Sequence, residues 1–324
     1  MPDILVAIGA SQGGVLALRR VVSELPRDFP APVLVVLHIG PQQSMLPSLL
    51  NEVGRLHASH AQNGERIRSG HIHVAPPDCH MIVVDGRLEL SHGPRENWAR
   101  PAIDPLFRSA AEAYGAGAIG ILMTGQLNDG TAGLFEIKRR GGIAIVQDPS
   151  EAEASSMPRS AIENVSVDFC LPLSEMGREL TGLVMERSSA RKPVKAGERA
   201  MSNDHQEIRN PSAQTCPECG GAMAKEMLGT IARYRCHIGH AMTAEVLVVA
   251  QLYALEKEIE SVLRTLNERR RLCEEMADKH AATGNEAQHG LWQRAAEETR
   301  SREELMRKLA EAEWVRPETG TPAE

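Results

Sequence analysis

Three residues of the chain have the types that acyl transfer requires: Ser11, His38 and Asp129. A serine hydroxyl can attack a carbonyl, an imidazole can take and return its proton, and a carboxylate can fix the imidazole tautomer. Ser11 stands in Gly-Ala-Ser-Gln-Gly at 9–13, between an apolar run and a segment of helical character. This is the nucleophile-elbow pattern, in which the N–H groups at the helix start can hold an oxyanion. The alternative interpretation is a strand-to-helix turn in which Ser11 only caps the helix.

Each of the three residues stands at the end of a continuous apolar run, at 4–8, 32–38 and 118–123. Segments of helical period lie between the runs, and a further apolar run follows at 143–147. Continuous apolar strands separated by helices indicate a parallel sheet covered on both faces, hence an α/β, doubly wound, mostly parallel fold. Such sheets place functional residues beyond the carboxyl ends of their strands, so the three side chains are expected at one edge.

The segments Gly70–Ala75 and Met81–Leu90 predict a β-ribbon, a hairpin inserted into this fold, with its turn at Asp85–Gly86. Other residues could fill two of the three roles. The alternative bases are His71, His73 and His80, and the alternative carboxylates are Asp104, Asp148 and Asp168. The chain order Ser, His, Asp also differs from that of the α/β-hydrolases. Geometry must therefore decide the triad.

A second cluster of chemistry-bearing residues predicts a metal site. Cys216 and Cys219 form a Cys-x₂-Cys pair, and Cys236 with His240 can complete a tetrahedral Cys₃His zinc site of zinc-ribbon type. His237 is the alternative fourth ligand, but it adjoins Cys236, and neighbouring side chains of a strand point apart. The remaining interpretation is that the cysteines are reduced and bind nothing. A zinc deaminase is excluded because no His-x-Glu accompanies the cysteine pair.

The predicted organisation has five parts. We expect a catalytic domain at 1–185, a linker at 186–212, a zinc-ribbon-like module at 213–243, an α-helical hairpin at 244–316 and a disordered tail at 317–324. In the hairpin, apolar residues from Leu252 to Met276 step by three and four. A break at 282–285 precedes a second helix, so the pair either folds back on itself or forms a homodimer through the first helix.

Composition narrows the function classes. The chain has 324 residues and a net charge of −7, which gives no reason to expect nucleic-acid binding. No apolar run approaches the roughly 18 residues needed to span a bilayer, and no signal peptide is evident, so we expect a cytoplasmic protein without membrane insertion.

Six motifs together resemble the catalytic domain of the chemotaxis methylesterase CheB family, over about residues 3 to 180. They are Gly-Ala-Ser-Gln-Gly-Gly at 9–14, Leu-His-Ile-Gly-Pro at 37–41, Gly-His-Ile-His-Val-Ala-Pro-Pro at 70–77, Arg-Pro-Ala-Ile-Asp-Pro-Leu-Phe at 100–107, Met-Thr-Gly-Gln-Leu-Asn-Asp-Gly at 123–130 and Ser-Met-Pro-Arg-Ser-Ala-Ile at 156–162. The resemblance implies that Ser11 is the nucleophile, His38 the general acid/base and Asp129 its orienting carboxylate. It also implies hydrolysis of glutamyl methyl esters on chemoreceptor signalling helices, with glutamine deamidation as a related activity and no cofactor for catalysis.

The chain departs from the family pattern at three positions, and family members usually carry a receiver domain before the catalytic domain. Gln12 follows the nucleophile where threonine is common, and Gln126–Leu127 replaces the usual Met-Gly before the aspartate. The amide of Gln126 is a candidate oxyanion donor beside Gln12. The run before Ser11 starts close to the first residue, so we expect no control by a receiver domain within this chain. A non-catalytic docking protein and a general serine esterase are the alternative functions.

Overall fold

The computed structural model describes residues 2–40, 42–189 and 211–315. They form two compact units, one ending at Leu247 and one beginning at Val248. Most of the predicted linker, residues 190–210, and the predicted tail at 317–324 lie outside the described residues. Residues 186–189 are the end of a helix, and a strand begins at Pro211.

The first unit contains a seven-stranded sheet, and every pair of neighbouring strands in it is parallel. In spatial order the strands are β3 (His57–His60), β4 (His71–Val74), β2 (Val33–Leu37), β1 (Leu5–Ala10), β7 (Ala118–Leu122), β8 (Ile143–Gln147) and β9 (Phe169–Leu171). From the central β1 the chain adds β2, β3 and β4 on one side and then β7, β8 and β9 on the other, so the predicted doubly wound α/β fold is confirmed.

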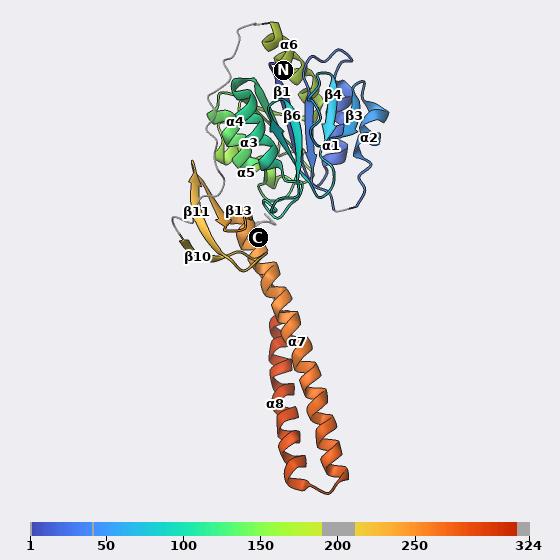
Figure 1. Cartoon of the computed structure of the whole chain (residues 1–324), viewed down its shortest axis with the longest axis vertical. Coiled ribbons are helices and arrows are strands. Elements are labelled where there is room, and N and C mark those ends of the chain that lie inside the picture. The colour runs from blue at the N-terminus through green and yellow to red at the C-terminus, as the bar shows by residue number, and fades with distance from the viewer. Residues whose placement is uncertain (1, 41, 190–210, 316–324) are drawn as a thin grey trace. The chain divides into compact units, whose positions relative to one another are not determined.

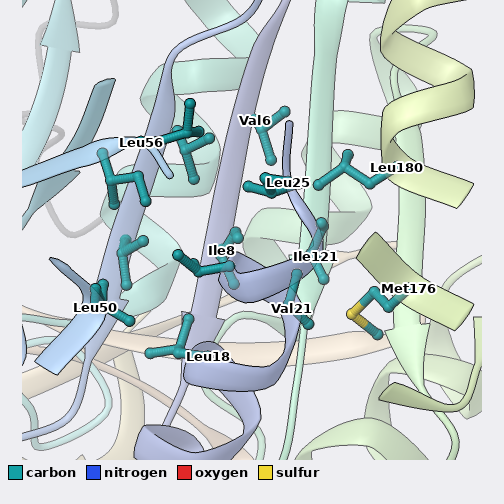
Figure 2. Close-up of a cluster of buried hydrophobic side chains, with 14 of the residues drawn as sticks. Val6, Ile8, Leu18, Val21, Leu25, Leu50, Leu56, Ile121, Met176 and Leu180 are labelled. Atoms are coloured by element: carbon teal, nitrogen blue, oxygen red, sulfur yellow. The ribbon is translucent and has the colours of Figure 1, made fainter. Parts of the chain in front are cut away.

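Helices cover both faces of this sheet (Figure 1). One face carries α1 (Gly14–Glu24), α2 (Leu46–Val53) and α6 (Leu173–Ser189), and the other carries α3 (Ile103–Tyr114), α4 (Thr131–Arg139) and α5 (Ser156–Asn164), with a short 3₁₀ turn at Gly115–Gly117. Alternate residues of β1 serve the two faces. Val6 and Ile8 pack with Leu18 and Val21 of α1 (Figure 2), whereas Leu5 packs on the side of α3. Burial on both faces explains the continuous apolar runs.

The predicted β-ribbon is correct in one half and wrong in the other. β5 (His80–Val84) and β6 (Arg87–Ser91) form an antiparallel hairpin, and Asp85 and Gly86 both have positive φ at its turn. The segment at 70–75 belongs instead to the main sheet, where β4 pairs in parallel with β2 and β3. Its alternation of histidines and apolar residues, which predicted a hairpin strand, also suits a strand near the edge of a parallel sheet.

A second, four-stranded antiparallel sheet follows in the same unit. Its strands are β10 (Pro211–Thr215), β11 (Ala222–Leu228), β12 (Ile231–Cys236) and β13 (Ala241–Thr243), and we call this sheet with its turns the C-terminal module. It coincides closely with the predicted zinc-ribbon-like module.

The remaining residues form α7 (Ala244–Ala282) and α8 (Glu286–Ala310). Gly284 has a positive φ at the break, and the side chain of Asn285 caps α8 by accepting from the Gln288 N–H. Arg270 of α7 donates to Glu303 of α8 over 3.0 Å, so the two helices form a hairpin closed on itself. Within the described residues, no helix is both long enough and apolar enough to cross a membrane.

Candidate active site

Ser11 stands in the turn between β1 and α1. Its N–H donates to the carbonyl of Thr124 over 2.9 Å, which ties this turn to the loop after β7. Gly13 has a φ of +75°, a left-handed conformation that opens α1 without strain only at glycine. Gly125 must also be glycine, because a Cβ there would lie 2.7 Å from Ser11 Cβ and 2.1 Å from Met157 Sδ. The local sequence thus fixes the serine at the sheet edge.

His38 lies between the other two predicted triad residues. Its N–H donates to the Ala10 carbonyl over 3.1 Å, which places its ring beside the end of β1. Nε2 is 2.7 Å from Oδ2 of Asp129, and Nδ1 is 3.2 Å from Oγ of Ser11. A carboxylate only accepts hydrogen bonds, so Nε2 carries the proton and the lone pair of Nδ1 faces the serine hydroxyl. The three side chains therefore have the arrangement that activates a serine.

Asp129 is 2% exposed, and its carboxylate accepts several hydrogen bonds. Oδ2 accepts from the Ile103 N–H over 2.6 Å as well as from His38, and Oδ1 accepts from the side-chain amide of Asn97 over 2.7 Å. The Ile103 N–H belongs to the first turn of α3, where the helix dipole favours a negative charge. Burial alone would raise the pKa of Asp129, but the hydrogen bonds from His38, Ile103 and Asn97 lower it below its ordinary value.

A second buried carboxyl, Asp104, lies beside Asp129. It accepts from the Gly133 N–H over 2.6 Å and from the same Asn97 amide over 2.8 Å. Burial and the nearby charge of Asp129 raise the pKa of Asp104 to about 7. The site thus holds its negative charge on Asp129, the carboxyl that contacts the histidine.

The two glutamines near Ser11 contact one another. Nε2 of Gln126 donates to Oε1 of Gln12 over 3.2 Å, and Gln126 is exposed. Within the described part of the chain, the backbone N–H groups of Gln12 and Gly13 have no hydrogen-bond acceptor. Leu127 has a φ of +62°, where glycine is favoured. Backbone N–H groups and one amide side chain are therefore available near the nucleophile.

A cleft opens next to His38. It has a volume of about 450 Å³, and its walls include Arg95, Trp98, Arg100 and Leu127. Arg100 is held by an ion pair of 2.7 Å with Asp78. The cleft combines cationic, aromatic and aliphatic groups beside His38 and is large enough to admit a polypeptide side chain.

The competing residues occupy other places. His71 is bonded to a serine hydroxyl, His73 to a glutamate and His80 to a backbone carbonyl. Asp148 accepts from a nearby turn N–H, and Asp168 pairs with a lysine. None of these contacts involves Ser11, so the structure brings together the predicted triad and leaves these five competitors outside, whereas Asp104 lies beside Asp129.

The structure also gathers the predicted metal ligands. Ligand atoms of Cys216, Cys219, Cys236 and His240 all lie within 4.8 Å of one another. Nδ1 of His240 faces the thiols, while its Nε2 lies 3.5 Å from a carboxylate oxygen of Glu218, a partner that would orient the ring. Three thiols and one imidazole around a common point fit a tetrahedral metal ion. The cluster can therefore hold a metal.

Three buried polar residues near the triad were not predicted from the sequence: Asn97, Asn128 and Thr243. Asn97 and Asn128 lie in loops, and Thr243 ends a strand of the C-terminal module. No pattern of spacing marks them, and their role is visible only in the contacts they make.

Comparison with known proteins matches the part of the chain that contains this cluster. The family model for CheB methylesterase matches residues 6–180. A relative from Leptospira interrogans is 40% identical over 173 residues, which are 53% of this chain and 90% of that protein. A relative from Anaeromyxobacter dehalogenans, named protein-glutamate methylesterase/protein-glutamine glutaminase 2, is 40% identical over 180 residues, but these make up only 53% of its length.

The CheB methylesterase catalytic domain of Thermotoga maritima gives a structural match with a TM-score of 0.54 at 34% identity, over 56% of this chain and 98% of that one. Family model, relatives and structural match all fall on the part of the chain that carries the Ser11, His38 and Asp129 cluster. The chain therefore belongs to the CheB methylesterase family.

Proposed function

We propose that the chain is a protein-glutamate methylesterase that acts through Ser11, His38 and Asp129. The observation that carries the proposal is the bridging position of His38, whose two ring nitrogens contact the hydroxyl and the carboxylate. Relatives of the family carry the name protein-glutamate methylesterase/protein-glutamine glutaminase, which supports this reaction.

The geometry supplies each proton transfer that ester hydrolysis needs. Ser11 Oγ attacks the carbonyl carbon of a glutamyl methyl ester while Nδ1 of His38 takes the hydroxyl proton. The imidazolium then returns this proton to the methoxy oxygen, so methanol leaves and an acyl-enzyme remains. A water molecule, deprotonated by the same nitrogen, attacks the acyl carbon, and the imidazolium gives this proton to Ser11 Oγ as the bond to the glutamate carboxylate breaks. Asp129 stabilises the imidazolium throughout.

The developing oxyanion needs donors near Ser11. The backbone N–H of Gln12, the residue after the nucleophile, is the expected first donor. The second hydrogen of the Gln126 amide is the proposed further donor, since the Gln12 side chain holds this amide in place. Attack on a glutamine side chain would follow the same course with ammonia as leaving group, which supports glutamine deamidation as a second activity.

For the substrate we propose the methylated signalling helices of chemoreceptors, and for the location the cytoplasm, where those helices lie. The cleft beside His38 supports a polypeptide substrate, because its wall contains Arg95, a cation that suits a glutamate-rich helix.

For the Cys₃His cluster we propose a structural zinc ion held by Cys216, Cys219, Cys236 and His240. All four positions are filled by protein ligands, which is typical of structural rather than catalytic zinc. The ion would hold the C-terminal module together and take no part in the ester chemistry.

For the helical hairpin we propose partner docking, with a second copy of the chain as the simplest partner. Apolar side chains remain exposed along both helices, namely Leu255, Val262, Leu272, Leu291 and Leu305. Light scattering on the full chain and on a variant with Leu272 and Leu305 changed to glutamate distinguishes a dimer from a monomer.

The test of the main proposal is methanol release from a methylated chemoreceptor signalling domain by the purified chain and by its Ser11→Ala variant. Release by the chain and none by the variant is expected. A chain that binds metal, melts cooperatively and releases no methanol would contradict the proposal and leave a docking role.

A further inference from the structure

The C-terminal module contacts the residues that hold the triad carboxylate. The link runs through Asn97, which is 7% exposed and lies in the loop before α3. Its N–H donates to the Ala241 carbonyl of β13 over 2.8 Å, and its side-chain oxygen accepts from the Thr243 N–H over 3.1 Å. Both partners belong to the end of the module.

These contacts determine which way the Asn97 amide points. A backbone N–H can only donate, so the Thr243 N–H must face the amide oxygen. The amide nitrogen is then directed to the opposite side, where it donates to Oδ1 of Asp129 over 2.7 Å and to Oδ2 of Asp104 over 2.8 Å. Without the Thr243 N–H, the amide oxygen would lose this donor, and the carboxylates alone would hold the amide in place. A group of the module thereby orients the donor to Asp129.

A second contact reaches the neighbour of Asp129. Thr243 is fully buried, and its hydroxyl donates to Oδ1 of Asn128 over 2.7 Å, while Nδ2 of Asn128 donates to Glu245 over 2.9 Å. Asn128 is 4% exposed and directly precedes Asp129. Thr243 therefore contacts both Asn97, which donates to the Asp129 carboxylate, and Asn128, the residue that precedes Asp129.

Charge complementarity supports the same contact. Glu96, next to Asn97, is paired with Arg108 over 2.7 Å. Burial alone would raise the pKa of Glu96, but Arg108, together with Arg233 and Arg235 of β12, lowers it to about 2. The positive charges of the module thus act favourably on a carboxylate next to Asn97.

The metal-ligand cluster lies directly before this contact. His240 is the residue before β13, and its carbonyl accepts from the Cys236 N–H over 2.9 Å. The segment 240–243 therefore begins at the metal-ligand cluster and ends at Thr243, which contacts the residues around Asp129.

We propose that the C-terminal module is an activating element within the chain: through Thr243 it positions Asp129, by way of the Asn97 amide and the Asn128 side chain. This inference rests on the proposed function, because it assumes that Asp129 assists His38. Asn97, Asn128 and Thr243 are positioning residues that act through Asp129.

The test compares threonine variants of the full chain. Thr243→Val removes the hydroxyl bond to Asn128, and Thr243→Ser retains it. Thr230→Val is the matched control, because the Thr230 hydroxyl also bonds an asparagine of the catalytic domain, Asn164, over 3.0 Å, but at a place away from the triad. Asn97→Ala removes the amide donor itself.

Two readouts are taken: the kcat and KM of methanol release, and the rate at which a fluorophosphonate labels Ser11. We expect Thr243→Val to lower kcat and the labelling rate about tenfold with KM within twofold, and Asn97→Ala to lower them by about 10–100-fold. Thr243→Ser and Thr230→Val should match the unmodified chain. Melting temperatures establish that every variant is folded at the assay temperature.

The failures are distinguishable. If the unmodified chain releases methanol and labels, but Thr243→Val and Asn97→Ala equal it, the inference is wrong while the proposed function stands. Equal losses in Thr243→Val and Thr230→Val would also contradict it, since module contact in general would then matter rather than Thr243. An unmodified chain that neither labels nor releases methanol would contradict the proposed function, and the inference with it.

Discussion

Nε2 of His38 lies 2.7 Å from Oδ2 of Asp129, and this contact leaves Nδ1 as the nitrogen that faces the nucleophile. The contact selects one tautomer, since only the form with its proton on Nε2 satisfies the carboxylate. The Asp129 side chain is 3% exposed, so a positive charge on His38 would be stabilised by a buried carboxylate.

Asp129→Asn tests the consequence of this tautomer. The asparagine has nearly the same shape, but its amide nitrogen would donate to Nε2 of His38. The histidine proton would then lie on Nδ1, and Nδ1 could not accept the proton of Ser11. We expect kcat to fall about 10⁴-fold with a small change in KM. Asp148→Asn is the matched control, a carboxylate at the end of β8 that contacts no triad residue. A tenfold loss or less in Asp129→Asn would contradict the assigned role.

Gln126→Ala tests the proposed oxyanion donor. Loss of a donor to the tetrahedral intermediate typically lowers kcat by about 10²–10³-fold. We expect a loss in this range with KM nearly unchanged, measured as methanol release. Gln43→Ala, at an exposed glutamine, is the control. A kcat of Gln126→Ala within about twofold of the unmodified chain would assign oxyanion binding to the backbone alone.

Leu127 is a test of backbone conformation. Its φ of +62° costs an L residue about 1–2 kcal/mol relative to glycine, and a β-branched side chain is the least tolerant. Leu127→Gly should therefore unfold at an equal or higher temperature than the unmodified chain, and Leu127→Val should unfold at a lower one. Calorimetric melting checks both. Equal melting temperatures for Gly and Val would mean that the backbone at this position is not strained.

Metal removal tests the Cys₃His cluster and its fourth ligand. We expect about one zinc ion per chain by elemental analysis, lost in His240→Ala and retained in His237→Ala, because only His240 lies within the cluster. Cys219→Ser should lose the metal and lower the melting temperature, whereas Cys170→Ser, at an exposed cysteine outside the cluster, should do neither. Full zinc content in His240→Ala would contradict the assignment.

Asp104 predicts a pH dependence of stability. Its pKa is raised to about 7 in the folded chain, by burial first and by the charge of Asp129 second. Between the ordinary carboxyl pKa of about 3.9 and pH 7, the unfolded chain has released this proton and the folded chain retains it. The unfolded state therefore binds fewer protons, so the contribution of Asp104 to the free energy of unfolding decreases as the pH rises through this window.

Asp104→Asn cannot release a proton and should remove this contribution. We expect the free energy of unfolding in urea, measured from pH 5 to pH 8, to decrease less with pH in the variant than in the unmodified chain, whatever the constant offset between them. Parallel curves across this range would show that Asp104 does not titrate there.

The convergence of Ser11, His38 and Asp129 was predictable because it depends on strand ends. Ser11 and His38 directly follow strands, and Asp129 lies in the loop after a third strand. Parallel strands bring their carboxyl ends to one edge whatever the details of packing. The same holds for the metal ligands, since the close spacing of Cys216 and Cys219 limits the turns that can contain them.

Other parts of the fold lacked such a signal. β3 reads His-Ala-Ser-His, and as an edge strand it needs few apolar residues. The segment of β4 alternates like a hairpin strand, so its pattern predicted the wrong partner. Asn97 and Thr243 are 146 residues apart, and a hydrogen bond between two such ordinary residues leaves no trace in local composition.

The large separation along the chain between the residues of each contact also determines the order in which they are synthesised. Thr243 is 115 residues beyond Asn128, so the ribosome completes the whole sheet and the triad before it adds the residue that holds them. A nascent chain that has emerged only as far as α6 already contains Ser11, His38 and Asp129, yet its Asn97 amide lacks the Thr243 partner. Full esterase activity would thus arise late in translation, when the last strand of the module has left the ribosome.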